Sequence, residues 1–338
     1  MKAVTVTSPF NLDSVQLTEV KDPGQPAKGE IRVAIKASSL NFHDLMVATG
    51  AMPVEDSRIL LSDGAGIVEA VGEGVTEFRV GDAVVSTFFP QWAAGKATPA
   101  VGGFAHTPGD GVDGLASEVV VRPVNAFTPA PAGWSHTEAA TITTSGLTAW
   151  RALVVNGRLK AGETVLVQGT GGVSIAALQL AKAMGARVIA TSSSDEKLAM
   201  VRKLGADDTI NYRTTPEWGD KVLELTHGLG VDHIVEVGGP ATINESLKAV
   251  KVGGHIAVIG VLSGKDAALS IFSILAKQVR IEGLIVGSRQ DQIDYVKALE
   301  LMSQKPVIDK VFSYERLGEA FAHLQSGQHV GKVCVSWE

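Results

Sequence analysis

The chain has 338 residues, which is enough for two domains of ordinary size, each with its own core. Hydrophobic residues make up 45% of it and charged residues 20%, and the formal net charge is −6, values typical of a globular protein. No dense run of Lys and Arg occurs, so nucleic acid and anionic membranes are not expected partners. The first residues lack the apolar segment of a signal peptide, and no apolar stretch is long enough to span a membrane.

Cys334 is the only cysteine, which excludes an intramolecular disulfide and favours a cytoplasmic location. A structural zinc site needs about four Cys and His ligands at short spacings. The eight histidines are scattered along the chain and form no such array. We therefore expect no metal site.

In chain order, the first third predicts β-structure. Short β-branched runs alternate there with Gly, Pro and Asp turns, at residues 1–9, 30–40, 64–72, 81–89 and 116–123. Residues 90–114 are rich in Gly, Pro and Ala without periodicity, which predicts an exposed loop.

From about residue 161, six apolar runs alternate with helical patterns. The runs are residues 164–169, 187–192, 208–212, 231–239, 254–264 and 279–287. This alternation predicts an α/β fold with a doubly wound, six-stranded parallel sheet. The tail from residue 288 holds a further helical pattern at 292–304 and a strand pattern at 331–338. Neither extends the six units, so we expect the tail to return to the first domain.

The first of the six turns carries a glycine cluster between a strand and a helix. Without Cβ atoms, backbone N–H groups there can approach a pyrophosphate at the helix N-terminus. An ordinary tight turn is the alternative, and Ser174 stands where the usual motif has its third glycine. Because this turn opens the run of βα units, we predict a dinucleotide site at Gly169, Thr170, Gly171, Gly172 and Val173.

The end of the second strand bears on the choice of coenzyme. An NAD site usually offers an acid there to the ribose 2′-hydroxyl. This chain has Thr191, Ser192 and Ser193, and its first acids, Asp195 and Glu196, fall in the expected first helical turn. NADP is therefore favoured, with a 2′-phosphate held by Ser192, Lys197 and Tyr212 or Arg213. Alternatively, Lys197 and Arg213 are solvated surface charges.

Five segments resemble the medium-chain dehydrogenase/reductase superfamily, in its zinc-free, quinone-oxidoreductase-like branch. They are residues 37–50, 60–75, 139–150, 167–182 and 252–260, and they fall in the family's order over essentially the whole chain. The resemblance implies a GroES-like β-barrel catalytic domain from residues 1–124 and 288–338. It also implies a Rossmann domain over residues 125–287 and a homodimer joined through residues 279–287.

The positions that match the zinc ligands of related enzymes carry other residues here. Asn41 and Thr144 stand at cysteine positions, and Ser62–Asp63 stand at a His–Glu pair. The cysteines of a structural zinc lobe are also missing from residues 90–114. The resemblance therefore implies catalysis without zinc.

Without a metal, hydrogen-bond donors must stabilise the charge that hydride transfer creates on oxygen. The resemblance places Asn41 and Thr144 beside the nicotinamide, with Asp44 orienting its neighbours. Thr148 would face the same side one helical turn later. The carboxyl ends of later strands would complete the cofactor site with Gly238, Gly260, Val261, Leu262, Val286, Gly287 and Arg289.

Several side chains have two interpretations. His43 could donate to the developing oxyanion or relay a proton, or it could simply pack in the fold. Asp63 could act as a general acid, although its setting is typical of a turn-stabilising Asp. Arg289 could reach a phosphate or form a surface ion pair. Phe88, Trp92 and Phe104 could line an apolar substrate pocket or form local core.

The sequence thus predicts an NADPH-dependent reductase of quinones or α,β-unsaturated carbonyls, with a small-molecule carbonyl or quinone as its partner. A metal-free NAD(P)-dependent alcohol dehydrogenase or aldehyde reductase is the alternative among enzymes. A non-catalytic NADPH-binding protein is the alternative outside them.

Overall fold

The computed structural model describes residues 1–302 and 304–337, so Ser303 and Glu338, at the ends of the two predicted tail elements, lie outside the described residues. The chain forms two compact units, Met1–Leu147 with Val286–Glu338, and Thr148–Ile285. The first unit therefore includes residues 125–147, which the sequence analysis had placed in the Rossmann part. They belong to it because helix α2 (His136–Ala140) contacts strands β3, β5, β6 and β16.

The first unit is built on two sheets. A seven-stranded sheet has the order β15-β16-β3-β5-β6-β8, with β7 also paired to β3, and a three-stranded sheet has the order β2-β1-β4. Strand β16 runs antiparallel to β3, with Cys334 opposite Ser39, so the tail returns to this unit as predicted. The strands are β1 (Lys2–Val6), β2 (Val15–Glu19), β3 (Glu30–Ser39), β4 (Arg58–Ile59), β5 (Ala65–Val71), β6 (Ala83–Ser86), β7 (Val119–Pro123), β8 (Phe127–Pro129), β15 (Ile308–Ser313) and β16 (Lys332–Ser336).

Helices of the first unit position the segments that carry the predicted site. Besides α2 they are α1 (Phe42–Ala48), α9 (Arg289–Leu301) and α10 (Leu317–Gln325). Residues Ile142–Gly146 form the π-helical turn η4, and the short helix α3 (Leu147–Trp150) follows it. Most of α3 and a second π-helical segment, η5 (Arg151–Asn156), already belong to the second unit. Residues 90–114 contain a 3₁₀ segment, Pro99–Phe104, and an isolated bridge between Pro108 and Val112, in agreement with the predicted loop.

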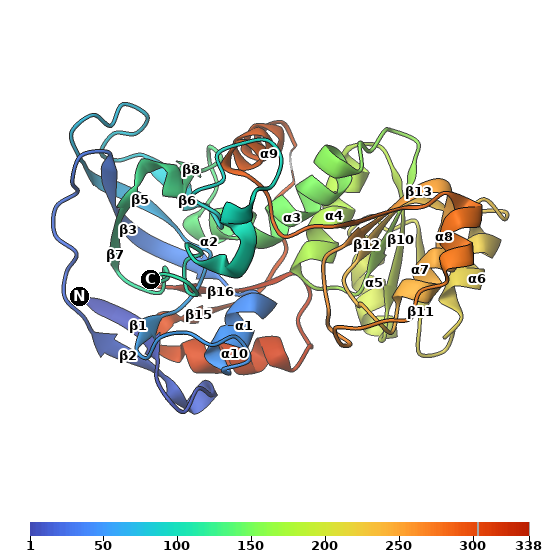
Figure 1. Cartoon of the computed structure of the whole chain (residues 1–338), viewed down its shortest axis with the longest axis horizontal. Helices are drawn as coiled ribbons and strands as arrows, with labels where there is room; N and C mark the ends of the chain where they lie inside the picture. Colours follow the sequence, from blue (N-terminus) through green and yellow to red (C-terminus); the bar gives the residue numbers. More distant parts are fainter. Residues whose placement is uncertain (303, 338) are drawn as a thin grey trace. The chain divides into compact units, whose positions relative to one another are not determined.

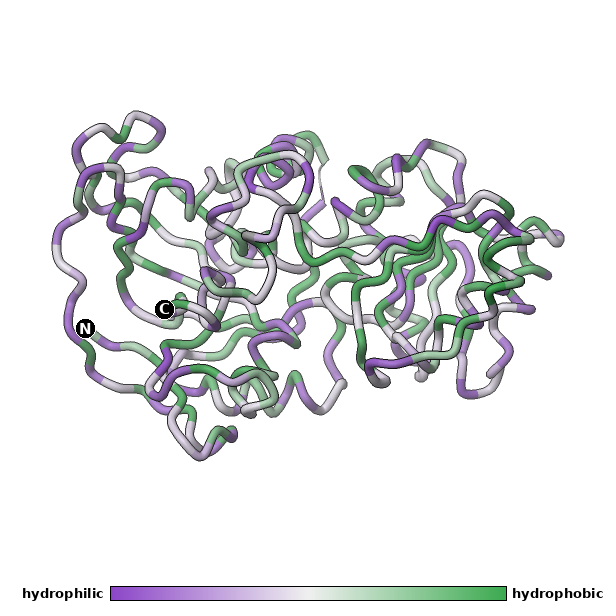
Figure 2. The backbone as a smooth tube through the Cα atoms, viewed as in Figure 1, coloured by the Kyte–Doolittle hydropathy of each residue, from purple (hydrophilic) through white to green (hydrophobic). Residues whose placement is uncertain are grey.

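The second unit contains the six-stranded parallel sheet that the sequence predicts (Figure 1). Its order, β11-β10-β9-β12-β13-β14, is that of a Rossmann fold. Figure 2 shows its strands as largely apolar, as expected for a sheet buried on both faces. The strands are β9 (Thr164–Gln168), β10 (Arg187–Ser192), β11 (Asp208–Asn211), β12 (Val231–Glu236), β13 (Val250–Val258) and β14 (Arg280–Gly283).

Five helices of the second unit pack against these strands. They are α4 (Gly172–Ala183), α5 (Asp195–Lys203), α6 (Trp218–Leu225), α7 (Ile243–Ala249) and α8 (Ile271–Lys277). Within residues 1–302 and 304–337, no helix has the length and apolar character needed to cross a membrane.

Candidate active site

The start of helix α1 is fixed by a buried carboxylate. Asp44 Oδ2 accepts a hydrogen bond from the Asn41 backbone N–H (2.8 Å). Its Oδ1 accepts from both the N–H and the hydroxyl of Ser62 (2.9 Å each). Burial opposes the charge of Asp44, but His43 and Ser62 outweigh it, and the pKa of Asp44 is lowered. Asp44 thus orients the two segments that carry Asn41 and Ser62.

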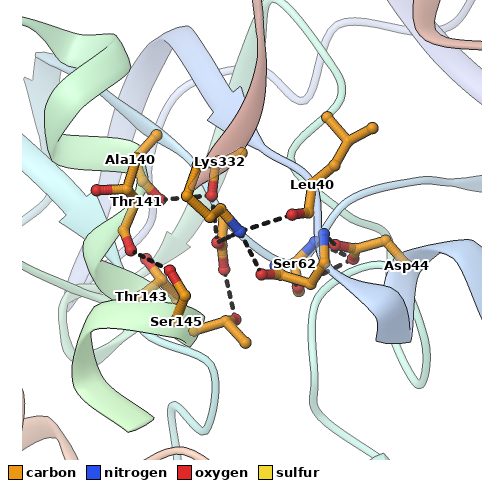
Figure 3. A network of polar contacts seen from close by, with 12 residues as sticks. Leu40, Asp44, Ser62, Ala140, Thr141, Thr143, Ser145 and Lys332 are labelled. Carbon is orange, nitrogen blue, oxygen red and sulfur yellow. Dashed lines mark hydrogen bonds and ion pairs between the residues drawn. The ribbon is translucent and has the colours of Figure 1, made fainter. Parts of the chain in front are cut away.

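A buried lysine, which the sequence analysis missed, organises the same cluster. The Lys332 ammonium donates to the Leu40 carbonyl and to Asn41 Oδ1 (2.6 Å each), and Figure 3 shows the first of these contacts. Because Lys332 occupies the amide oxygen, Asn41 presents its Nδ2 group as a donor, 3.4 Å from Ser62 Oγ. A single Lys at the start of an otherwise apolar final strand was the signal in the sequence.

Asp63 contacts Thr144 and is completely buried. Its Oδ1 accepts a hydrogen bond from the Thr144 hydroxyl, and its Oδ2 accepts one from the Ser39 hydroxyl (2.6 Å each). Burial raises the pKa of Asp63, against the opposing effect of the Lys332 ammonium 3.9 Å away. Thr144, in the turn η4, is the only one of these three side chains that is partly exposed.

His43 lies between two carboxylates and two aromatic rings. Its Nε2 is 3.0 Å from Asp110 Oδ2, and its Nδ1 is 3.9 Å from Asp44 Oδ1. Burial lowers the pKa of His43, but the hydrogen bond to Asp110 and the negative charge of Asp44 prevail and raise it to about 9. The Phe88 and Phe104 rings each lie 5.3 Å from the imidazole. The charged imidazole therefore joins α1 to the loop at residues 90–114.

Trp92, which was predicted to line a substrate pocket or form local core, belongs to local structure. Its indole N–H donates to the Gly95 carbonyl (3.1 Å), and its ring lies 6.2 Å from that of Phe89. Phe89 in turn packs edge-on against Phe88 (4.8 Å). The aromatic residues thus form a continuous buried cluster that ends at His43.

In the second unit, the glycine turn has the geometry of a phosphate loop. Gly169 has a φ of +71°, and a Cβ at Gly169 or Gly171 would meet nothing within 4 Å, so the backbone is open to a ligand. No side chain caps the first turn of α4, whose N-cap is Gly171. The residues thus fit a dinucleotide pyrophosphate. Ser174, at the position of the missing glycine, donates to the Gln168 carbonyl (2.6 Å) and thereby ties the helix to β9.

The end of β10 carries no acid. Ser192 is buried there, and Asp195 and Glu196 fall in the first turn of α5, as predicted. Asp195 accepts a hydrogen bond from the Asn211 side chain (2.8 Å). Tyr212 is 41% exposed, and its backbone N–H bonds to Ser192 (3.0 Å), so these two predicted residues are neighbours.

The loop after β12 is held by a buried acid that sequence reasoning missed. Glu236 Oε1 accepts from the backbone N–H groups of Gly238 (2.9 Å) and Gly239 (3.0 Å). At Gly260 any Cβ would lie 2.1 Å from the Val237 carbonyl, so glycine is required there. Val261 and Leu262 follow with largely exposed side chains.

The remaining predicted residues fall in different surroundings. Thr148 is buried in α3 and opens the second unit, while Thr144 belongs to the first. A π-helical turn that contains Thr144 precedes α3, and the alignment of Thr148 with Thr144 stays a prediction. Val286 and Gly287 lie in the first unit, as does Arg289, whose guanidinium pairs with Glu77 and donates to the Phe127 carbonyl (2.9 Å). Arg289 is therefore engaged in its own unit rather than free for a phosphate.

The residues at the matched ligand positions do not fit zinc. Of Asn41, Ser62, Asp63 and Thr144, only Asp63 is a usual zinc ligand, and both its oxygens already accept hydrogen bonds. The Lys332 ammonium beside them would repel a second cation. Across the part of the chain that the structure describes, no group of three His, Cys, Asp or Glu side chains is arranged to hold a metal ion.

Comparisons with known proteins agree with this architecture. The family description "Alcohol dehydrogenase GroES-like domain" matches residues 27–132, and "Zinc-binding dehydrogenase" matches residues 172–304. A zinc-type alcohol dehydrogenase-like protein of Schizosaccharomyces pombe is 39% identical, over 96% of this chain and 95% of its own. The structure of a candidate alcohol dehydrogenase from Sinorhizobium meliloti 1021 has a TM-score of 0.92 and 40% identity, over 99% of this chain and 98% of its own. That of an NAD-dependent alcohol dehydrogenase has a TM-score of 0.90 and 33% identity, over the whole of both chains.

Proposed function

This chain belongs to the medium-chain dehydrogenase/reductase superfamily, and from that membership we propose that it reduces quinones or α,β-unsaturated carbonyls with NADPH and without a metal. Its relatives include alcohol dehydrogenases that match it over nearly their full length, which makes the chain an NAD(P)H-dependent oxidoreductase. The finer points, namely coenzyme, acceptor and independence from zinc, are the proposal.

The polar cluster around Lys332 carries the proposal. When bound, a dihydronicotinamide supplies a hydride, and the acceptor oxygen then gains negative charge. We assign the stabilisation of that charge to the Thr144 hydroxyl and the Asn41 amide. Lys332 fixes the orientation of the amide, and Asp44 fixes the backbone that carries it. In this proposal the neutral donors Thr144 and Asn41, together with the Lys332 ammonium, take the role that a Lewis-acid metal has in related enzymes.

The preference for NADPH is supported by the end of β10. A 2′-phosphate is an anion, and an acid at the strand end would repel it. Here the strand ends in Ser192, and Asp195, in the first turn of α5, accepts a hydrogen bond from Asn211 at the end of β11. Ser192, Lys197 and Tyr212 are the side chains that we assign to the 2′-phosphate.

Alcohol or aldehyde chemistry is the second candidate, and the names of the relatives favour it. An alkoxide is far more basic than an enolate or a hydroquinone anion, so its formation demands a stronger proton donor. The Asn41 amide and the Thr144 hydroxyl are uncharged hydrogen-bond donors, which stabilise the delocalised anion of a conjugated acceptor more readily than a localised alkoxide.

A panel of acceptors separates the candidates. NADPH oxidation is followed with 9,10-phenanthrenequinone, with a cyclic enone and with a medium-chain aldehyde at equal concentrations. We expect the quinone or the enone to be reduced with the highest kcat/KM. An aldehyde that outperforms both would replace the proposed reaction with the second candidate.

A further inference from the structure

The Asp63 carboxyl has an unusual set of partners for a buried acid. Among the described residues, its hydrogen-bond donors are two hydroxyls, those of Ser39 and Thr144. A backbone N–H can only donate, whereas a hydroxyl can donate or accept. The surroundings of Asp63 therefore accommodate a carboxylic acid as readily as a carboxylate.

The second hydrogen-bond partner of Ser39 allows Asp63 to be either protonated or ionised. Its hydroxyl lies 3.1 Å from the Ala140 carbonyl as well as 2.6 Å from Asp63. When Asp63 carries a proton on Oδ2, it can donate to Ser39, and Ser39 can donate to Ala140. When the proton is on Oδ1, it is donated to Thr144, whose own proton is then free to point away from Asp63.

The cluster contains one more carboxyl group than cations, and the hydrogen-bond partners of the three carboxyl groups differ in whether they can accommodate a proton. The cations Lys332 and protonated His43 face three acids, Asp44, Asp110 and Asp63. Asp44 accepts two backbone N–H groups and a hydroxyl, which favour its ionised form. Asp110 forms the ion pair with His43. The nearby Cys334 thiol is neutral, because burial raises its pKa to about 12.

Resting on the proposed function, we propose that Asp63 is protonated in the resting protein and is the proton source behind Thr144. As hydride forms the new C–H bond of the acceptor, the Thr144 hydroxyl gives its proton to the acceptor oxygen. Asp63 Oδ1 passes its own proton to Thr144 in the same relay and becomes a carboxylate 3.9 Å from the Lys332 ammonium. The product has gained one hydride and one proton, and a water proton returns through Thr144 after its release.

Two substitutions interrupt this relay at its two ends. Asp63→Asn keeps the shape of the side chain but removes the acidic proton, and Thr144→Val removes the connecting hydroxyl. Each should lower kcat about 100-fold while the Kd for NADPH, measured by fluorescence, stays within about 2-fold. Because both act on one relay, the double variant should be no slower than either single variant.

Two further variants separate the relay from a structural role. Thr144→Ser retains the hydroxyl and should recover most of the kcat lost in Thr144→Val. Ser39→Ala removes a hydrogen bond to the same carboxyl without cutting the path to Thr144, and should lower kcat less than about 10-fold. A loss in Ser39→Ala equal to that in Asp63→Asn would overturn the relay.

An infrared difference spectrum provides a readout that needs neither cofactor nor turnover. Wild type minus Asp63→Asn should show the carbonyl band of a protonated carboxylic acid, shifted in heavy water. If the wild type is active but lacks this band, the relay is overturned while the proposed function stands. The same follows if the kcat losses of the two single variants multiply in the double variant. If none of the tested acceptors is reduced by the wild type at the expense of NADPH, the proposed function is overturned, and the relay with it.

Discussion

At the scale of single residues, His43 shows how the surroundings of a side chain decide its role. Its Nε2 is hydrogen-bonded to Asp110, its Nδ1 faces the Asp44 carboxylate at 3.9 Å, and the Phe88 and Phe104 rings pack against the imidazole. It therefore acts first as an ion-pair link between α1 and the loop at residues 90–114. The donors that remain for a bound acceptor are Asn41 and Thr144.

His43→Gln should destabilise the protein in a manner that depends on pH. The pKa of His43 is raised from 6.5 to about 9, so its contribution to folding is full below 6.5 and is lost as the pH rises through about 9. Urea unfolding at about pH 6 should show a deficit on the order of 3 kcal/mol at most, and at about pH 10 the deficit should largely disappear. The matched control His323→Gln removes a more exposed pair with Asp309 and should cost less than about 1 kcal/mol. An equal deficit for His43→Gln at both pH values would contradict the link.

At the scale of elements, strong periodicity made the Rossmann unit predictable. Its six strands bury both faces, so each appears in the sequence as an apolar run bounded by turn residues. Strands β2, β4, β8 and β15 and helices α1, α2 and α10 were not predicted. β2 and β15 carry exposed polar residues, while β4 and β8 are only two and three residues long.

The candidate site was predictable only in part, because some of its residues come together through contacts between distant parts of the sequence. Asn41 and Thr144 stand out because they replace cysteines of related enzymes. Lys332 and Ser39 come from strands β16 and β3, which meet only through the pairing of the tail with the first unit. No local pattern reports such a long-range contact, and the π-helical turn at Thr144 has no sequence signature either.

The end of β10 should control coenzyme choice. Ser192→Asp places an acid at the strand end, where it can accept from a ribose 2′-hydroxyl and repel a 2′-phosphate. The ratio of kcat/KM for NADPH to that for NADH should fall at least about 10-fold. Ser326→Asp makes the same charge change at an exposed serine of the first unit and should leave the ratio unchanged. An unaltered ratio in Ser192→Asp would refute the assignment of the 2′-phosphate site.

At the scale of the whole molecule, the homodimer expected through residues 279–287 stays a prediction, and two features of the second unit support it. Strand β14 lies at the edge of its sheet, so one side of it is not paired within the described chain. Beside it in sequence, Ile271, Phe272 and Leu275 of α8 are 71%, 76% and 72% exposed. We infer that a second copy covers this surface.

Charged substitutions on α8 test the dimer. Phe272→Asp combined with Leu275→Lys should convert a dimer to a monomer in sedimentation equilibrium, because burying these charges is costly. Leu301→Asp, at an equally exposed leucine of the first unit, should leave the mass unchanged. A wild-type monomer, or a dimer that survives the double substitution, would rule out this interface.

We propose that Lys332, Asn41, Asp63 and Thr144 together perform the task of a catalytic zinc. The most direct test is the rate of NADPH oxidation with 9,10-phenanthrenequinone before and after exhaustive treatment with a strong chelator, with zinc content measured on the same samples. We predict the same rate in both and no stoichiometric zinc. A chelated protein that loses its activity and regains it on addition of zinc would contradict the account.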